Sequence, residues 1–291
     1  MSTVPPSEVD PSRQTFAETL GKAPGRGRLA GRRILVVGGG QRATVDENPP
    51  VGNGRAISLL FAREGAQIAC MDMSLEAADA TCAMIGAEGG SAFSVEFNVL
   101  EADRIAAVVD DCAARMGGLD GLVLVVGVTP HVPLADISIE QWQLAYDVNV
   151  RAHMLFCKRA IQIMDPGGSI VIISSLSALR ADARNPAYET SKNAQIALAR
   201  SVAMAGEPKG IRCNSVAPGV MDTPMGRDAG RKRGGARAAG VPFGRQGTAW
   251  EVAYGTLFLM SGEASYVNGH CLLVDGGFGV QITRPAEAPK S

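Results

Sequence analysis

The fold of this chain is decided by a stretch near its start, Arg33-Ile34-Leu35-Val36-Val37-Gly38-Gly39-Gly40. Its apolar run predicts a β-strand that is buried on both faces, and the three glycines predict a tight turn after it. A second glycine group, Gly52-Asn53-Gly54, follows an excursion over residues 42–51 and opens a helical pattern. Glycines let the backbone approach a pyrophosphate closely, and the free amides of the following helix point at that charge. We therefore expect this turn to bind the phosphates of a dinucleotide.

The alternation of short apolar strands and longer helical stretches continues along the chain. Strands are predicted at 34–37, 67–71, 92–97, 121–126, 169–174, 212–217 and 271–274, and helices near 54–64, 75–86, 101–116, 140–164, 186–206 and 248–261. This alternation is typical of a parallel sheet covered by helices on both faces. We expect one α/β domain over 29–280, a doubly wound, Rossmann-like sheet of seven parallel strands, with a flexible N-terminal arm over 1–28 and a C-terminal tail over 281–291.

Composition argues against several classes of protein. The 291 residues carry a net charge of -1, so no global field attracts nucleic acid or an anionic membrane, and no apolar run approaches the length of a membrane span. The six cysteines form no C-x-x-C pair and are expected to be reduced. The three histidines include no pair four residues apart, which gives no support for a metal site. We expect a cytoplasmic protein with no metal and no nucleic-acid or membrane partner.

Asp72 ends the second predicted strand. A carboxylate at that position can accept hydrogen bonds from the ribose hydroxyls of adenosine, and it repels a 2′-phosphate. Asp72 therefore favours NAD over NADP as the cofactor. The alternative is that Asp72 only caps the next helix, near Ser74.

Acid–base chemistry is indicated by a second motif, Tyr188-Glu189-Thr190-Ser191-Lys192. A tyrosine and a lysine four residues apart lie on the same face of a helix, and a nearby ammonium group lowers the phenol pKa from about 10 toward the working pH. Ser175, at the end of a strand thirteen residues before Tyr188, can hold a substrate oxygen while the tyrosine moves its proton. These groups suit the interconversion of an alcohol and a carbonyl. The alternative is an amphipathic helix with an exposed lysine.

In order and spacing these motifs resemble the short-chain dehydrogenase/reductase family, in its short single-domain form, over about residues 30–280. The glycine turn is similar to the family's T-G-x-x-x-G-x-G motif, Pro218–Thr223 to its P-G-x-x-x-T segment, and Val274–Gly277 to its closing strand and turn. The resemblance implies a catalytic tetrad of Asn149, Ser175, Tyr188 and Lys192. It implies cofactor contacts at Gly38, Gly40, Gln41, Asn53, Gly54, Asp72, Asn98, Val99, Val126, Gly127, Tyr188, Lys192, Pro218, Gly219, Val220 and Thr223.

The family's chemistry is reversible hydride transfer at a nicotinamide. The resemblance implies that Tyr188 is the general base or acid, that Lys192 lowers its pKa and binds the nicotinamide ribose, and that Asn149 holds a water near Lys192. Ser175 would orient the substrate oxygen. Ser174 is its neighbour, but adjacent strand residues face opposite ways, and the family's spacing selects Ser175.

The chain departs from the family pattern in three places. Val37 replaces the usual threonine, and residues 42–51 open the glycine turn as either a solvated bulge or a flap over the cofactor. Leu124-Val125-Val126-Gly127 replaces the family's N-N-A-G. The two missing asparagines remove hydrogen bonds that brace the cofactor pocket, so either neighbouring backbone compensates for them or the affinity for the cofactor falls.

Residues 225–243 are expected to form a substrate lid. The stretch is rich in arginine, which could attract a carboxylate, a phosphate or an acyl carrier, or could simply be solvated. We expect an NAD(H)-dependent oxidoreductase of a small-molecule secondary alcohol or ketone, with NADP possible. The alternatives are an NADPH-dependent reductase of 3-oxoacyl thioesters and a non-catalytic, dinucleotide-sensing protein of the same fold. The resemblance also implies a homotetramer.

Overall fold

The computed structural model describes residues 14–181, 184–232 and 241–280. Seven parallel strands form one sheet in the order β3-β2-β1-β4-β5-β6-β9, which confirms the predicted architecture. The strands are β1 (Arg33–Val37), β2 (Gln67–Asp72), β3 (Ser91–Glu96), β4 (Gly121–Leu124), β5 (Ser169–Ile173), β6 (Arg212–Pro218) and β9 (Cys271–Val274). The central strands are buried almost throughout, as expected for a sheet covered on both faces.

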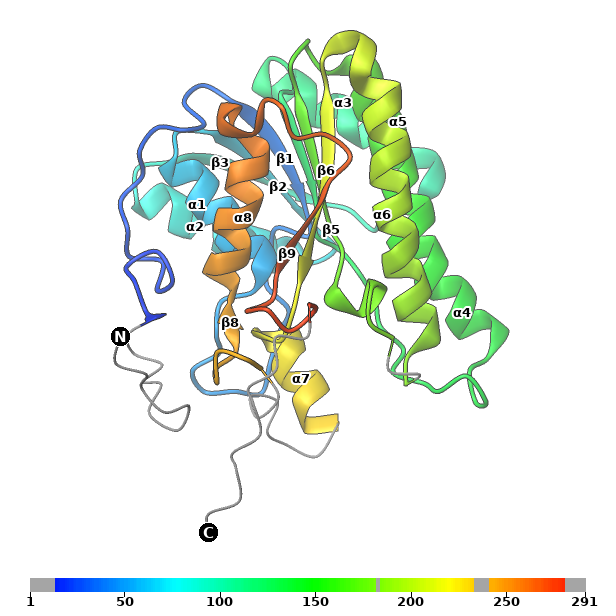
Figure 1. Cartoon of the computed structure of the whole chain (residues 1–291). Helices are drawn as coiled ribbons and strands as arrows, with labels where there is room; N and C mark the ends of the chain where they lie inside the picture. The colour runs from blue at the N-terminus through cyan, green and yellow to red at the C-terminus, as the bar shows by residue number, and fades with distance from the viewer. Residues whose placement is uncertain (1–13, 182–183, 233–240, 281–291) are drawn as a thin grey trace.

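Helices cover both faces of the sheet (Figure 1). One layer contains α1 (Asn53–Arg63), α2 (Leu75–Ala87) and α8 (Ala249–Met260), and the other contains α3 (Ile105–Met116), α4 (Ile139–Tyr146), α5 (His153–Ile163) and α6 (Pro186–Gly206). Each layer packs a separate hydrophobic cluster against the sheet. Each fully buried leucine or isoleucine in these clusters stabilises the fold by about 1.5–3 kcal/mol. Short 3-10 turns lie at Ala102–Arg104, Leu176–Ala178, Glu207–Lys209 and Gly262–Ala264.

Strand order reverses next to β1, because β2 pairs with one of its edges and β4 with the other. At such a switch point the loops that leave the two strands diverge and open a crevice outside the carboxyl ends of the sheet. The loops after β1, β4, β5 and β6 all emerge at this edge. The fold therefore gathers the predicted motifs at one end of the molecule.

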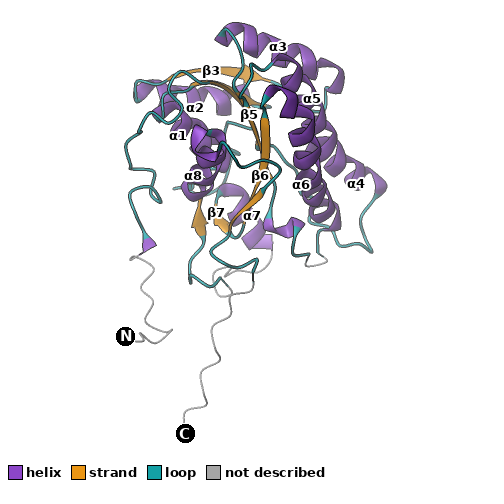
Figure 2. Ribbon diagram, turned by 45° about the horizontal axis from the view of Figure 1, so that its top comes forward, coloured by secondary structure: helices purple, strands orange, loops and turns teal. Residues whose placement is uncertain are grey.

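Two local predictions were wrong in detail. The helix predicted over 140–164 is divided into α4, a π-helical turn at Asp147–Ala152, and α5. The strand predicted over 121–126 ends at Leu124, because the amides of Val125 and Val126 both donate to the carbonyl of Val37, at 2.9 and 3.2 Å. The lid region, for which no helix or strand was predicted, contains a short helix, α7 (Pro224–Lys232). It lies beside a two-stranded ribbon of β7 (Met221–Asp222) and β8 (Gly247–Thr248) (Figure 2).

The described part of the N-terminal arm lies along α1 and α8. Arg63 donates to the carbonyl of Gly21 at 2.7 Å, and the hydroxyl of Thr248 donates to the carbonyl of Thr19 at 2.8 Å. Residues 1–13 and the C-terminal tail predicted over 281–291 lie outside the described residues. Within the described ranges, no helix is both long enough and apolar enough to cross a membrane.

Candidate active site

The three glycines that follow β1, Gly38 to Gly40, leave the turn without side chains. Gly38 has a left-handed φ of 84°, and the amides of Gly38 and Gly39 both donate to the carbonyl of Met71, at 2.8 and 2.9 Å. A Cβ on Gly54 would overlap the Gly38 carbonyl, so α1 begins directly against the turn. The N-cap of α1 is Gly52, which offers no side-chain acceptor to the first amides of the helix. These amides are the kind of donor that a pyrophosphate takes up.

Gln41 closes the base of the 42–51 excursion, because its Oε1 accepts from the amide of Gly52 at 3.0 Å. The next residue, Asn53, has a buried Oδ1 with no hydrogen-bond partner among the described residues. Buried polar atoms are rarely left unpaired. Together with the uncapped amides of α1, this acceptor fits a site for the phosphate and ribose groups of a dinucleotide.

Asp72 lies beside the glycine turn at the end of β2. Its Oδ2 accepts from the amide of Gly40 at 3.0 Å and its Oδ1 from the amide of Ser74 at 3.2 Å. The cap of α2 is Ser74, whose hydroxyl accepts from the amide of Ala77. Asp72 therefore connects the turn to the start of α2, and its carboxylate is held at the edge where an adenosine ribose would bind.

Asn149 lies in the π-helical turn and is fully buried. Its Oδ1 accepts from the amide of Val128 at 2.8 Å, and its Nδ2 donates to the carbonyl of Val128 at 3.0 Å and to the hydroxyl of Ser191 at 2.9 Å. Asn149 thus joins the loop after β4 to α6. Widened helical turns of this kind are frequent at functional sites.

Lys192 is buried one helical turn after Tyr188, with only 3% of its surface exposed. Its Nζ donates to the carbonyl of Ile173 at 2.9 Å and lies 5.6 Å from the centroid of the Tyr188 ring. Removal from water lowers the pKa of Lys192 to about 7, because burial disfavours the charged form. Tyr188 itself is half-buried. The two side chains therefore share one site in which a proton can be gained or lost near neutral pH.

The two serines at the end of β5 have different partners. The hydroxyl of Ser174 is buried and donates to the carbonyl of Lys192 at 2.7 Å. Ser175 is half-buried, and its Oγ accepts from the amide of Ser177 at 3.2 Å as the cap of a short 3-10 turn. Ser174 joins the strand to α6, whereas the Ser175 hydroxyl donates to no acceptor among the described residues.

Gly127 leaves a space beside the catalytic candidates. A Cβ built on it would lie 3.2 Å from Lys192 Nζ and 3.3 Å from Asn149 Oδ1. Any side chain here would crowd both groups. Gly127 is also the glycine that ends the family's N-N-A-G segment. The space that it leaves next to Lys192 fits the ribose and nicotinamide end of the cofactor.

The remaining candidates lie at the same edge. Gly219 donates to the carbonyl of Val274 at 3.0 Å, and the carbonyl of Val220 accepts from Gly247 at 3.0 Å. Thr223 is buried, and its hydroxyl accepts from the amide of Gly226 at the start of α7. After β3, Val99 is buried, while Asn98 is exposed and uses its Oδ1 for the amide of Leu100.

The 42–51 loop contacts the helix of the predicted lid. Asp46 is mostly buried and pairs with Arg231 at 3.0 Å and with Arg227 at 3.7 Å. Arg227 also pairs with Asp222 at 2.7 Å, and Arg231 with Asp228. The loop is therefore fastened to α7, and the two described arginines of α7 both have carboxylate partners. Arg233 and Arg237 lie outside the described residues.

Several polar residues at the site were not predicted. Asn185 precedes α6, accepts from the amide of His131 at 3.2 Å and donates to Thr129, so it holds the loop after β4 against α6. His153 and Gln195 are fully buried and bond to one another. The sequence does not indicate that these single polar residues form hydrogen bonds at the site, because their partners are distant along the chain.

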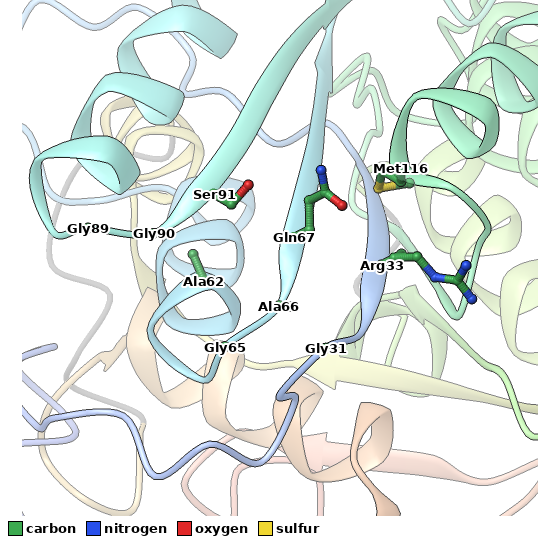
Figure 3. A pocket seen from close by; sticks show the side chains of 10 residues that line it. All are labelled: Gly31, Arg33, Ala62, Gly65, Ala66, Gln67, Gly89, Gly90, Ser91 and Met116. Carbon is green, nitrogen blue, oxygen red and sulfur yellow. The ribbon is translucent and has the colours of Figure 1, made fainter.

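A shallow hollow of about 540 Å³ lies at the opposite edge of the sheet (Figure 3). It is bordered by the first residues of β1, β2 and β3, namely Arg33, Gln67 and Ser91. Arg33 is the single ionisable residue of its lining, and its guanidinium is paired with Asp120 at 2.7 Å. The hollow therefore offers no acid–base pair, and the chemistry lies at the carboxyl edge.

Known proteins match this arrangement closely. Residues 51–279 match the family model described as Enoyl-(Acyl carrier protein) reductase. The chain is 35% identical to cyclopentanol dehydrogenase of Comamonas sp. (strain NCIMB 9872) over 87% of its own length and 98% of that protein. It is 34% identical to a short-chain dehydrogenase/reductase structure from Burkholderia xenovorans, with a TM-score of 0.81, over 88% of this chain and 99% of that one.

A further structure, a short chain dehydrogenase from Burkholderia cenocepacia J2315 in complex with NADP, is 32% identical with a TM-score of 0.76, over 86% of this chain and 99% of that one. This chain belongs to the short-chain dehydrogenase/reductase family. It is an oxidoreductase of CH–OH groups that uses NAD(P) and acts on an alcohol or ketone. The predicted family, fold, enzyme class and use of a nicotinamide cofactor are confirmed.

Proposed function

We propose that Tyr188 is the general acid/base of this oxidoreductase, assisted by Lys192, Ser175 and Asn149, and that the preferred cofactor is NAD(H). The observation that carries the proposal is the burial of Lys192 beside the Tyr188 ring, 5.6 Å from its centroid, with Nζ bonded to the carbonyl of Ile173. An apolar residue would pack better than a buried lysine in this position, because burying a charged group costs free energy. Packing alone therefore does not explain Lys192.

Proton movement is the work of the chain's own residues. A bound nicotinamide would give or take the hydride. Tyr188 takes the hydroxyl proton of an alcohol or donates one to a carbonyl oxygen. Charged Lys192 favours the phenolate of Tyr188 and so prepares it as a base. Ser175 donates its hydroxyl proton toward the substrate oxygen and stabilises the charge that develops there.

Asn149 contributes by position. Its amide fixes both polar groups of Val128, which sets the backbone next to Lys192. We propose that Lys192 passes its proton onward through a water held near Asn149, as in the family.

The preference for NAD(H) rests on Asp72, whose carboxylate lies at the glycine turn. The carboxylate would accept from ribose hydroxyls and repel a 2′-phosphate. The relative from Burkholderia cenocepacia was solved in complex with NADP, so the binding of both cofactors to this protein must be compared directly. Fluorescence titration of the purified protein with NADH and with NADPH tests the proposal, and tighter binding of NADPH would refute it.

The thioester reductase alternative gains no support from the part of the lid that the structure describes. It relied on free positive charge over the site, but Arg227 and Arg231 are both paired with carboxylates. A small secondary alcohol is the better candidate, and cyclopentanol is the first substrate to assay because a relative is named for it.

We also propose a homotetramer located in the cytoplasm. Large apolar side chains are exposed on the outer helices and near the C-terminal strand, among them Leu144, Met154, Met204, Phe258 and Tyr266. All six cysteines are free thiols, which suits a reducing compartment. Light scattering tests the first proposal and cell fractionation the second, and a monomer or a secreted protein would refute them.

The catalytic proposal is tested by Tyr188→Phe, which removes only the hydroxyl. We expect kcat to fall by about a hundredfold or more, because a positioned acid or base contributes roughly 10²–10⁴-fold, while NADH still binds. Tyr254→Phe is the matched control, since Tyr254 lies in α8 beneath Arg28. Unchanged turnover in Tyr188→Phe would overturn the assignment.

A further inference from the structure

His153 and Gln195 form a buried polar pair behind the active site. His153 is the first residue of α5 and Gln195 lies in α6, and both are completely inaccessible to solvent. The His153 Nε2 lies 3.1 Å from the carbonyl oxygen of Val126, and its Nδ1 lies 3.1 Å from Gln195 Nε2. Gln195 Nε2 also donates to the carbonyl of Asn149 at 2.7 Å. The proposed proton transfers use neither side chain.

The direction of each hydrogen bond follows from the acceptors. The carbonyls of Val126 and Asn149 can only accept, so His153 carries its proton on Nε2 and Gln195 presents its amide nitrogen. His153 Nδ1 is then an acceptor for the second Gln195 proton. Burial, with a smaller contribution from the positive charge of Lys192, lowers the pKa of His153 to about 3. The ring therefore stays neutral over the working pH range, and the pair is a fixed brace.

The brace acts on the segment where the chain departs from its family. Leu124–Gly127 lacks the two asparagines of the N-N-A-G motif. In this chain His153 holds the carbonyl of Val126, and Asn149 holds both polar groups of Val128. Gly127 lies between these two anchored residues and borders Lys192 Nζ. The side chains that hold the segment therefore come from α5 and the π-helical turn.

Gln195 completes the connection, because it bonds the carbonyl of Asn149 to His153. This arrangement is costly, since Gln195 Oε1 is buried with no partner among the described residues. An unpaired buried acceptor destabilises a fold by about 1–3 kcal/mol. An unbranched apolar side chain would avoid that cost, so what Gln195 adds is the two bonds of its nitrogen.

We propose that His153 and Gln195 are positioning residues that fix Val126–Val128 and Asn149 around Lys192, in place of the family's missing asparagine braces. The proposal deepens the proposed function and rests on it. It concerns the nicotinamide end of the site, because the hydrogen bonds of this pair go to the carbonyls of Val126 and Asn149.

The test uses His153→Leu, Gln195→Met and the double variant in the full chain. We expect each single variant to lower kcat by roughly ten- to a hundredfold, the range that a small misplacement of reacting groups produces. We expect NADH to bind several-fold more weakly, with unchanged binding of ADP-ribose, which lacks the nicotinamide. Thr256→Val is the matched control, because it removes one buried hydrogen bond on α8, in the other helix layer.

The double variant separates positioning from stability. The double variant removes the unpaired Gln195 donor and the unpaired His153 Nδ1 that the single variants leave, so its loss of thermal stability should be smaller than the sum of the two single losses, whereas kcat should stay low. If kcat instead follows the melting temperature, or if the variants match Thr256→Val, the proposal is wrong. Should Tyr188→Phe retain full turnover, the proposed function fails independently of this result.

The wild-type protein provides a test that needs no variant. Histidine-selective NMR should show one ring that is protonated at Nε2 and does not titrate between pH 5 and 9. If no ring of the protein stays neutral across that range, the proposal is overturned even if every variant fails to fold.

Discussion

The carboxylate of Asp72 accepts a hydrogen bond from the backbone amide of Gly40 at 3.0 Å. A Cβ on Gly40 would lie 2.7 Å from the same oxygen, so the glycine and the carboxylate are fitted to each other. This contact sets the acid at the ribose end of the cofactor site before any ligand binds. We propose that the choice between NAD and NADP depends on this one side chain, which is already oriented.

Replacement of Asp72 by asparagine should reverse the cofactor preference. The change keeps the shape and removes the charge, so NADH loses a charge-assisted hydrogen bond and NADPH no longer meets repulsion. We expect NADH to bind about tenfold or more weakly and NADPH to bind more tightly, as measured by fluorescence titration. Asp79→Asn, which changes a nearby acid that bonds Ser94, is the control. Equal loss of both cofactors would show that Asp72 has only a structural role.

The buried charge of Lys192 should make stability depend on pH. The pKa of Lys192 is about 7 in the folded chain and 10.5 as an ordinary lysine. Between these values the unfolded chain binds the proton and the folded chain does not, so stability rises with pH. We expect Lys192→Met to be more stable than wild type below pH 7. That advantage should shrink by at most about 1.4 kcal/mol per pH unit toward pH 10.5, as measured by urea unfolding. A constant difference would contradict the burial of charge.

Sequence patterns predicted those parts of the molecule that depend on local order. The glycines at Gly38 and Gly54 and the carboxylate of Asp72 could be placed at one edge, because each follows or precedes a strand and parallel strands end together. The strand that begins at Gly121 was predicted to be too long. Its apolar run continues to Val126, but its pairing with the neighbouring strands ends at Leu124. The hydrophobicity of a segment does not predict where its backbone stops pairing with the adjacent strand.

Contacts between distant segments could not be predicted. His153 and Gln195 are 42 residues apart, and Asp46 and Arg231 are 185 residues apart. Their pairing depends on how α5 packs against α6 and on the path of the loop after β1. A lone histidine is equally compatible with the surface and the core until that packing is known. Neighbouring backbone was expected to compensate for the missing asparagines, and the carbonyl of Val37 does accept from the amides of Val125 and Val126. The side-chain bonds of His153 and Asn149 to the same segment were not predicted.

Gly127→Ala should impair turnover with little effect on folding. Gly127 does not have a positive φ, so alanine fits the backbone, but its Cβ would lie 3.2 Å from Lys192 Nζ and 3.3 Å from Asn149 Oδ1. We expect kcat to fall by about tenfold or more because both groups must shift. Gly86→Ala on α2 is the control, since its Cβ would meet no atom within 4 Å, and it should gain about 0.5–1 kcal/mol of stability. Normal turnover in Gly127→Ala would mean that Lys192 tolerates displacement.

Asp46→Asn should loosen α7 from the loop after β1. Asp46 bonds Arg231 at 3.0 Å and lies 3.7 Å from Arg227, and its side chain is 20% exposed. Loss of the charge weakens both pairs, by about 1 kcal/mol together on the scale of partly exposed ion pairs. We therefore expect trypsin to cleave after these arginines about fivefold faster, because cleavage follows the population of the locally opened state. In wild type, added salt should accelerate this cleavage by screening the pairs. In Asp46→Asn the acceleration should be smaller, because only the pairs of Arg227 with Asp222 and of Arg231 with Asp228 are left to screen. Glu101→Gln, which breaks an exposed pair with Arg104 elsewhere, is the matched control. If the variant and wild type are cleaved at the same rate with the same salt dependence, the loop and α7 move independently.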